Sequence, residues 1–225
     1  MGTTADTNYA TIAGRVAQLQ SGMAGHLPDD VLNTFVAEQT ALQAGGVPDG
    51  VAAPGDAMPD TQLLDVHGAT TTLAEAVGGR SAVVVFYRGA WCPYCNLALR
   101  AYQEDLVPHL VQRGVPLVAI SPQKPDGSLS MQEKNELSFT VLSDPGNHLA
   151  AALGVLTAPS DDARAAQRSL GLELSQANAD GTDGVPMPTV TIVDSAGIIR
   201  WIDVHPNYTS RTEVADIVDA LSALV

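Results

Sequence analysis

Two cysteines three positions apart are the residues of this chain whose type and spacing could do chemistry. Cys92 and Cys95 lie in the stretch FYRGAWCPYC (residues 86–95), and the sequence contains no further cysteine. Two thiols at this spacing across a helix start can come within the Cα separation of about 4.4–6.8 Å that a disulfide requires. The pair therefore points to redox chemistry in which it cycles between a dithiol and a disulfide.

A buried strand and a helix must position this pair. The continuous apolar run predicts a central strand over residues 81–87, covered on both faces, and a long helix follows over about 93–112. Because Pro93 suits the first helical position, Cys92 becomes the N-cap and Cys95 falls in the first turn. Free N–H groups and the helix dipole then stabilise a thiolate, so at least one thiol should have a pKa below the usual ~8.5. Arg88, a few residues upstream, adds positive charge.

Three other interpretations of the pair compete with the redox one. A zinc site would need four ligands, and the five histidines, at positions 26, 67, 109, 148 and 205, are remote from the pair in sequence. An inert pair of buried thiols stays open, as does a structural disulfide, although structural disulfides are rare in the cytosol. We favour the redox interpretation and expect no metal and no cofactor.

The length and composition are those of a chain that folds without structural disulfide bonds. Its 225 residues suffice for a hydrophobic core, so two cysteines are not needed as a scaffold. Acidic residues outnumber basic ones by 25 to 11, and the net charge of −14 argues against binding to nucleic acid or anionic lipid. There is no secretory signal pattern, and the longest apolar run, residues 82–87, is far short of a membrane span. We expect a cytoplasmic protein without a membrane partner.

The first fifty residues differ from the rest of the chain in their sequence pattern. Apolar residues recur at helical spacing between Tyr9 and Leu42, with a break near Gly22, Gly25 and Pro28, which predicts two helices. Glycines and prolines over residues 45–55 form a linker. We therefore divide the chain into an N-terminal helical arm with its linker (1–50) and one domain (51–225). The arm either covers its own domain or reaches across a homodimer.

Strand and helix patterns alternate after the linker. This alternation predicts a three-layer α/β domain with parallel strands in its sheet. A polar insertion over residues 156–185 carries one helix, and a capping-box pattern in Ser210–Glu213 opens the last helix. The predicted strands are 62–66, 81–87, 116–121, 140–142, 189–193 and 198–204, and the predicted helices after the one at 93–112 are 128–135, 147–153, 161–170 and the last.

Several short motifs in a fixed order resemble a known family. They are GDAMPD at 55–60, LSDPG at 142–146, the helix end LGV at 153–155, and IVD at 192–194 followed by Gly197. With the cysteine stretch, they resemble the thioredoxin-fold superfamily and, within it, peroxiredoxin-like members of the alkyl hydroperoxide reductase and thiol-specific antioxidant (AhpC/TSA) family. The resemblance covers nearly everything after residue 50. It implies a thioredoxin-like α/β fold, with a central mixed β-sheet flanked by helices, carrying an N-terminal helical extension.

The cysteine stretch fits two catalytic registers of that superfamily. In the thioredoxin register, Trp91 to Cys95 form a W-C-x-x-C motif, with Cys92 as nucleophile and Cys95 as resolving thiol. In the peroxiredoxin register, Cys95 is the peroxidatic cysteine and Cys92 replaces the usual threonine. The resemblance to thioredoxin also implies a cis-proline at Pro188, before Thr189, which faces the pair and shapes a substrate groove.

The departures from the peroxiredoxin pattern concern the groups that support catalysis. Arg88 replaces a common proline, Ala98 replaces a glutamate, and Pro188 stands where the family places an arginine. Arg88 or Arg100 could substitute for that arginine as the donor to the departing alkoxide.

The resemblance implies a thiol-dependent peroxidase that reduces hydroperoxides through Cys95 and Cys92. The attacking thiolate would become a sulfenic acid and condense with the other thiol, and thioredoxin or a low-molecular-weight thiol would reduce the disulfide. Two alternatives stay open: a thiol–disulfide oxidoreductase acting on protein disulfides, and a non-catalytic redox sensor or interaction module. The residues expected to support the thiolate or line a substrate groove are Arg88, Trp91, Pro93, Pro188 and Thr189.

Overall fold

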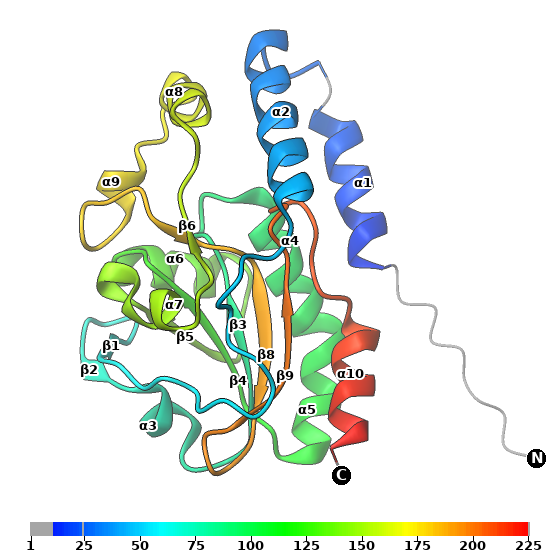
Figure 1. Cartoon of the computed structure of the whole chain (residues 1–225), viewed down its shortest axis with the longest axis vertical. Helices are drawn as coiled ribbons and strands as arrows, with labels where there is room; N and C mark the ends of the chain where they lie inside the picture. Colours follow the sequence, from blue (N-terminus) through cyan, green and yellow to red (C-terminus); the bar gives the residue numbers. More distant parts are fainter. Residues whose placement is uncertain (1–10, 24, 225) are drawn as a thin grey trace, which may run out of the picture.

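The computed structural model describes residues 11–23 and 25–224, and its centre is a mixed β-sheet (Figure 1). β3 runs parallel to β4, and β4 parallel to β5, whereas β8 and β9 are antiparallel to their neighbours. The predicted sheet flanked by helices is thus confirmed. Across the seven-stranded sheet the order is β2 (Thr70–Thr71), β1 (Leu63–Leu64), β5 (Thr140–Ser143), β4 (Leu117–Ser121), β3 (Ala82–Phe86), β8 (Thr189–Val193) and β9 (Ile199–Val204).

β3 is the strand that leads into the cysteine stretch, and it is buried along its whole length. Val83 and Val85 pack toward α4, while Val84 and Phe86 pack into the opposite layer. A strand covered on both faces needs a continuous apolar sequence, which explains why the run of valines predicted this buried strand correctly. β3 therefore delivers the following loop to a fixed place at the edge of the core.

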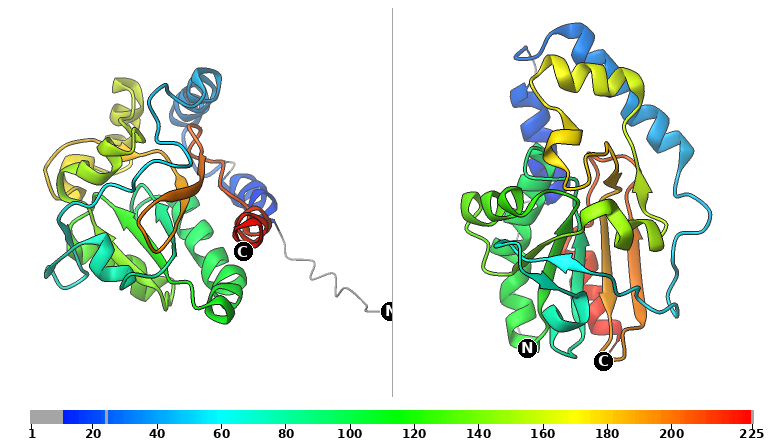
Figure 2. Two further views of the ribbon diagram at one scale, coloured as in Figure 1. Left: turned by 60° about the horizontal axis from the view of Figure 1, so that its bottom comes forward. Right: turned by 90° about the vertical axis from the view of Figure 1, so that its left-hand side faces the viewer.

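Helices cover both faces of the sheet, with α4, α5 and α10 on one face and α3 and α7 on the other (Figures 1 and 2). The last helix starts later than predicted, at Val214, and α6 starts earlier than predicted, at Pro125. These helices are α3 (Leu73–Val77), α4 (Pro93–Ala101), α5 (Val107–Arg113), α6 (Pro125–Lys134), the 3₁₀ turn η2 (Pro145–Asn147), α7 (His148–Ala152) and α10 (Val214–Ala223).

The long helix predicted over 93–112 exists but contains a wider turn. Between α4 and α5 lies a π-helical segment, η1 (Tyr102–Leu106), which ends two positions before Pro108. Proline has no N–H and its ring crowds the preceding turn, so a π-turn accommodates it without ending the helix. Tyr102 of this segment is fully buried, and its hydroxyl donates a 2.8 Å hydrogen bond to the carbonyl oxygen of Thr212.

The N-terminal arm forms two helices, α1 (Ile12–Met23) and α2 (Asp29–Gly45), as predicted within the described residues; Tyr9 lies outside them. α1 packs on α4 of the same chain and buries Ile12 and Val16. Arg15 adds ion pairs to Glu104 and Asp105 of η1 at 2.7 and 2.6 Å.

The insertion after α7 forms its own small layer beside α2. β6 (Leu156–Thr157) and β7 (Val185–Pro186) pair in antiparallel fashion, separated in sequence by α8 (Asp161–Ser169) and α9 (Leu174–Ala177). α8 packs against α2, so the arm and the insertion lie side by side at one end of the sheet (Figure 2). None of the described helices is long and apolar enough to cross a membrane.

The capping box predicted over Ser210–Glu213 is wrong. Glu213 is the N-cap of α10 but makes no side-chain cap there, because its carboxylate is used elsewhere. Its two oxygens accept hydrogen bonds from the N–H groups of Ile12 and Ala13 at the start of α1, both at 2.8 Å. The segment before Val214 is therefore an extended loop rather than a helical turn.

Candidate active site

Both cysteines lie at the start of α4, as the sequence predicts. Cys92 is the N-cap, and Pro93 occupies the first helical position. The Cys92 carbonyl oxygen accepts hydrogen bonds from the N–H groups of Cys95 and Asn96, both at 3.1 Å. The two sulfurs are free thiols and are almost completely enclosed, since Cys92 is 1% exposed and Cys95 is 0% exposed.

The loop between β3 and α4 is held by a close approach and by two amide side chains. At Gly89 (φ +150°) a Cβ atom would lie 2.4 Å from Trp91 Nε1, so only glycine fits. Gln123 Oε1 accepts a hydrogen bond from the Ala90 N–H. Asn96 Nδ2 donates to the carbonyl oxygens of Ala90 and Cys92 at 2.7 and 2.9 Å. These contacts fix the cysteines relative to the strand.

Arg211 is the basic residue in hydrogen-bonding contact with both thiols, and the sequence analysis missed it. Its Nη2 lies 3.3 Å from Cys95 Sγ and 3.9 Å from Cys92 Sγ. Its Nη1 donates to the carbonyl oxygens of Tyr208 and Ser210, which orient the guanidinium. The capping-box prediction explains this omission, because it placed Arg211 in a helical turn rather than in a loop that folds back over α4.

The two thiols have opposite pKa shifts. Burial opposes ionisation of Cys95, but the Cys92 thiol, the Arg211 charge and the Arg88 backbone N–H favour its thiolate, so the pKa of Cys95 is lowered. Burial and the neighbouring Cys95 raise the pKa of Cys92 well above its usual value. The arrangement therefore favours a thiolate on Cys95 and a protonated thiol on Cys92.

Arg88 is a second buried cation near the pair, and its guanidinium packs against the rings of Trp91 and Tyr208. It is 4% exposed, and its Cζ lies 4.0 Å from the ring centroid of Tyr208 and 5.0 Å from that of Trp91. Its charge favours ionisation of both thiols. Arg100, the other candidate substitute, is exposed and donates to Asn135 Oδ1 at 3.5 Å, so it does not reach the sulfurs.

The expected cis-proline at Pro188 is wrong, because none of the described peptide bonds is cis. Pro188 nevertheless lines a small cavity together with Cys95, Thr189 and Arg211. Thr189 is buried and its hydroxyl donates to the Met187 carbonyl oxygen at 2.9 Å. No local sequence pattern reports the isomer of a bond before proline.

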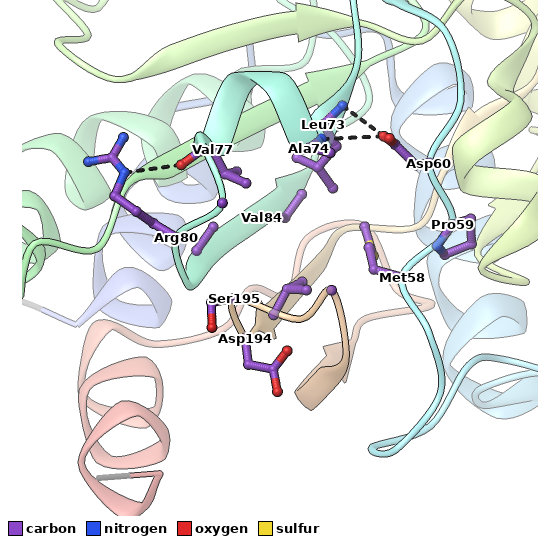
Figure 3. Close-up of a pocket in the computed structure, with 14 residues that line it drawn as sticks. Met58, Pro59, Asp60, Leu73, Ala74, Val77, Arg80, Val84, Asp194 and Ser195 are labelled. Carbon is purple, nitrogen blue, oxygen red and sulfur yellow. Dashed lines mark hydrogen bonds between the residues drawn. The ribbon is translucent and has the colours of Figure 1, made fainter.

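A separate cavity of about 160 Å³ lies away from the thiols, between α3 and the β8–β9 turn (Figure 3). Its lining is mostly apolar, with Met58, Leu73 and Val84 among the contributors, and it contains neither cysteine. Asp60 at its edge accepts hydrogen bonds from the N–H groups of Leu73 and Ala74 at 3.0 and 3.3 Å and so caps α3. This cavity presents no group suited to redox chemistry.

Comparisons with known proteins point to one family. The model of the AhpC/TSA family matches residues 54–202. A putative peroxiredoxin of Mycobacterium tuberculosis is 33% identical over 101 residues, which are 45% of this chain and 63% of that protein. Peroxiredoxin Bcp of Escherichia coli is 32% identical over 101 residues, 45% of this chain and 64% of that protein. The match thus spans less than two thirds of either relative.

Solved structures show the same architecture at lower sequence identity. Peroxidoxin BcpB from Mycobacterium tuberculosis superposes with a TM-score of 0.58 at 18% identity and covers 76% of this chain and 97% of its own. Reduced Prx3 from Vibrio vulnificus, solved in complex with H₂O₂, gives a TM-score of 0.61 at 19% identity and covers 76% of this chain and 99% of its own. These likenesses confirm the thioredoxin-like fold.

Proposed function

This chain belongs to the AhpC/TSA family, and on that premise we propose that it is a thiol-dependent peroxidase acting through Cys95 and Cys92. The observation that carries the proposal is the site itself: the buried Cys95 sulfur lies 3.3 Å from the Arg211 guanidinium and beside the Cys92 thiol, in surroundings that lower the pKa of Cys95 and raise that of Cys92. Thiolate, cationic donor and resolving thiol are the groups that a two-step peroxidase requires.

The first step reduces the peroxide and oxidises Cys95. The Cys95 thiolate attacks the terminal oxygen of ROOH, the O–O bond breaks, and the sulfur becomes a sulfenic acid while RO⁻ departs and takes a proton to give ROH. Arg211, 3.3 Å from the sulfur, donates to the oxygen on which negative charge develops. Arg211 thereby supplies the donor that Pro188 cannot supply.

The second step forms the disulfide. Cys92 loses its proton and attacks the Cys95 sulfur, the S–O bond breaks, and hydroxide leaves with that proton as water. Two electrons pass from the dithiol to the peroxide, and a reductant must return them. We propose thioredoxin or a low-molecular-weight thiol as that reductant, which places the protein in a reducing compartment such as the cytoplasm. A homodimer stays a prediction.

Exchange with protein disulfides is the less favoured function. A protein disulfide must reach the attacking sulfur, yet Cys92 is 1% exposed and Cys95 is 0% exposed. The trans peptide bond at Pro188 also lacks one of the two features that suggested this activity, the other being the W-C-x-x-C motif. A hydroperoxide is the smaller of the two substrates that these enclosed sulfurs could meet.

The test is to follow peroxide-dependent oxidation in the wild type, Cys92→Ser and Cys95→Ser. We expect Cys92→Ser to accumulate a trappable sulfenic acid on Cys95, and Cys95→Ser to consume peroxide no faster than free cysteine, a loss of at least ~10³-fold. Sulfenic acid on Cys92 in the Cys95→Ser variant at the wild-type rate would reverse the assignment. No sulfenic acid in either variant, with peroxide consumed at the rate of free thiol, would exclude the peroxidase.

A further inference from the structure

We propose that Asp203 and His205 are positioning residues for Arg211: they bond the residues on either side of it and so hold its guanidinium against the thiols. Asp203 lies near the end of β9 and His205 follows that strand directly, so we call the two residues the β9 pair. The inference rests on the proposed peroxidase and deepens it, because Arg211 is the donor of that reaction. It gives a role to two polar side chains that the redox steps themselves do not use.

The place of the Arg211 guanidinium depends on the backbone of its own loop. Its Nη1 donates to the carbonyl oxygens of Tyr208 and Ser210, and its Nη2 lies 3.3 Å from Cys95 Sγ. Among the described residues, no carboxylate lies within ion-pair distance of this guanidinium. Since the guanidinium bonds to carbonyl oxygens of the loop, any shift of the loop moves the cation relative to the thiols.

The β9 pair bonds to the residues immediately before and after Arg211. His205 Nδ1 lies 2.8 Å from the Ser210 hydroxyl oxygen, and the Thr212 hydroxyl donates to Asp203 Oδ2 at 2.8 Å. The two members of the pair are themselves joined, because His205 Nε2 lies 2.9 Å from the same Asp203 oxygen. The chain is therefore held one position before the arginine and one position after it.

The hydrogen-bond roles within the β9 pair follow from the charge of Asp203. The hydrogen bond from His205 lowers the pKa of Asp203, although partial burial opposes this shift, so the carboxylate is ionised at neutral pH. An ionised carboxylate only accepts, so His205 Nε2 carries a proton and donates it, and in the neutral imidazole Nδ1 accepts from the Ser210 hydroxyl. Hydrogen bonds to a charged acceptor are stronger than those between neutral groups, which suits a contact that must fix a loop.

The sheet and the π-helical segment anchor these contacts. β9 pairs with β8 along its length, and the His205 N–H donates to the Pro188 carbonyl oxygen at 2.9 Å. The buried Tyr102 hydroxyl of η1 donates to the Thr212 carbonyl oxygen at 2.8 Å. Thr212 is thus bonded through its side chain to the sheet and through its backbone to the helix that carries the cysteines. The loop has fixed partners on both elements that border the site.

The sign of the expected effect separates positioning from direct electrostatics. Asp203 is an anion, so its own charge opposes ionisation of a nearby thiol, and its removal without any movement of the loop would lower the pKa of Cys95. The Arg211 charge lowers that pKa. If Asp203 acts by holding Arg211 in place, its removal raises the pKa of Cys95 instead.

The test follows the pH midpoint of Cys95 alkylation by iodoacetamide, measured by mass spectrometry in a Cys92→Ser background. We expect Asp203→Ala to raise this midpoint by about one pH unit, because the guanidinium is no longer held against the sulfur. An unchanged or lowered midpoint in Asp203→Ala overturns the proposal. Thr212→Val, which removes a hydroxyl and no charge, should also raise the midpoint, whereas Thr212→Ser should keep it.

Arg211→Gln extends the measurement to a double-mutant cycle. If the β9 pair acts through Arg211, Asp203→Ala should not raise the midpoint further when Arg211→Gln is already present. A rise of the same size with and without Arg211 overturns the proposal, since the effect would then reach the thiol by another route.

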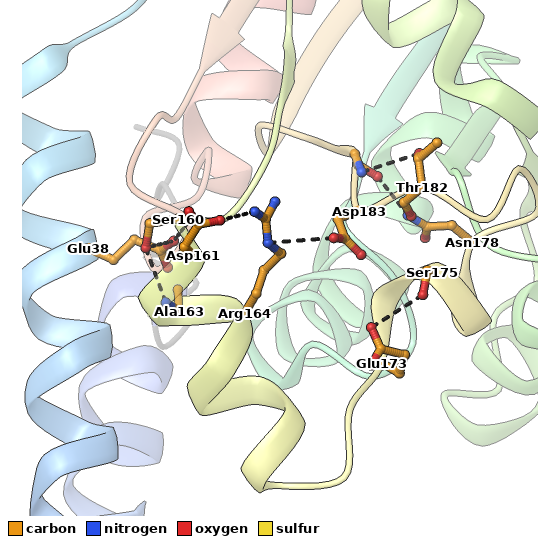
Figure 4. A network of polar contacts seen from close by, with 11 residues as sticks. Glu38, Ser160, Asp161, Ala163, Arg164, Glu173, Ser175, Asn178, Thr182 and Asp183 are labelled. Atoms are coloured by element: carbon orange, nitrogen blue, oxygen red, sulfur yellow. Dashed lines mark hydrogen bonds and ion pairs between the residues drawn. The ribbon is translucent and has the colours of Figure 1, made fainter.

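The matched control is Asp183, which forms an ion pair inside the insertion (Figure 4). Its side chain is 28% exposed, close to the 34% of Asp203, and it pairs with Arg164 at 3.6 Å. In the described chain its ion-pair partner is Arg164 and not Arg211. Asp183→Ala should leave the midpoint of Cys95 unchanged. An equal rise in Asp183→Ala and Asp203→Ala would overturn the proposal, because loss of one negative charge anywhere would then suffice.

A folding defect would not leave the question open. If urea titration shows that Asp203→Ala does not fold, the two Thr212 variants decide, and equal midpoints in Thr212→Val and Thr212→Ser overturn the proposal. The alkylation assay uses no peroxide, so its result is independent of the sulfenic-acid experiment. Failure of that experiment would refute the peroxidase and leave the positioning of Arg211 to be judged by the midpoints alone.

Discussion

The starts of α3 and α4 satisfy their backbone donors in opposite ways. At α3, Thr72 and Glu75 form a reciprocal capping box with bonds of 3.2 and 3.1 Å, and Asp60 accepts two further N–H groups. At α4, the N-cap is Cys92, which makes no side-chain cap. A capped start is neutralised and stable, whereas an uncapped start keeps its positive potential for an anion.

At a third helix start, that of α1, one of the capping groups is a carboxylate from the loop that carries Arg211. α1 is capped by Thr11, whose hydroxyl accepts from the Gly14 N–H at 3.0 Å, and by the distant carboxylate of Glu213. Glu213 is two residues from Arg211, so the loop that sends a cation to the thiols also anchors the arm. The capped start of α3 therefore contributes to stability, whereas the uncapped start of α4 leaves its positive potential for the reacting thiolate.

The strongest way to break this comparison is to remove the cation that faces α4. In Arg211→Gln we expect the pKa of Cys95 to rise, because the guanidinium favours its thiolate. Oxidation by peroxide at pH 7 should fall about 10–100-fold, since the Cys95 thiolate is less favoured and a cationic donor to the departing oxygen is lost. The pH midpoint of Cys95 alkylation, measured by mass spectrometry in a Cys92→Ser background, should move upward, and reactivity should recover partly at alkaline pH.

The matched control for this change is Arg100→Gln, which removes a cation from α4 that bonds Asn135 instead of the thiols. It should leave the pH midpoint of Cys95 unchanged. If both variants shift that midpoint equally, the general positive charge of the region, rather than the contact of Arg211 with the sulfurs, controls the thiolate.

Removing the distant cap should separate anchoring from chemistry. In Glu213→Ala the N–H groups of Ile12 and Ala13 lose a charged acceptor, which costs about 1–3 kcal/mol in the free energy of unfolding. Amide hydrogen exchange should accelerate in α1 and stay slow in β3, because only α1 depends on this contact. Unchanged protection of α1 would show that the packing of Ile12 and Val16 is sufficient to dock the arm.

Local signals made the first part of the site predictable. The valine run of β3 and a proline at the first position of α4 placed both cysteines correctly, since each pattern involves neighbouring residues only. Arg211 reaches Cys95 across 116 positions, and Glu213 reaches Ile12 across 201. Contacts at such separations leave no local pattern in the sequence. The serine-to-glutamate spacing at 210–213 matched the capping-box pattern, but the folded chain forms no capping box there.

The smallest expected effect tests the other side of the comparison. Thr72→Ala removes the side-chain acceptor for the Glu75 N–H at α3, which should lower the free energy of unfolding by about 1 kcal/mol in urea titrations. The rate of Cys95 oxidation should not change, because α3 packs on the opposite face of the sheet from α4. If Thr72→Ala slowed peroxide reduction as strongly as Arg211→Gln, the two helix starts would be energetically coupled, and the separation of stability from chemistry would not hold.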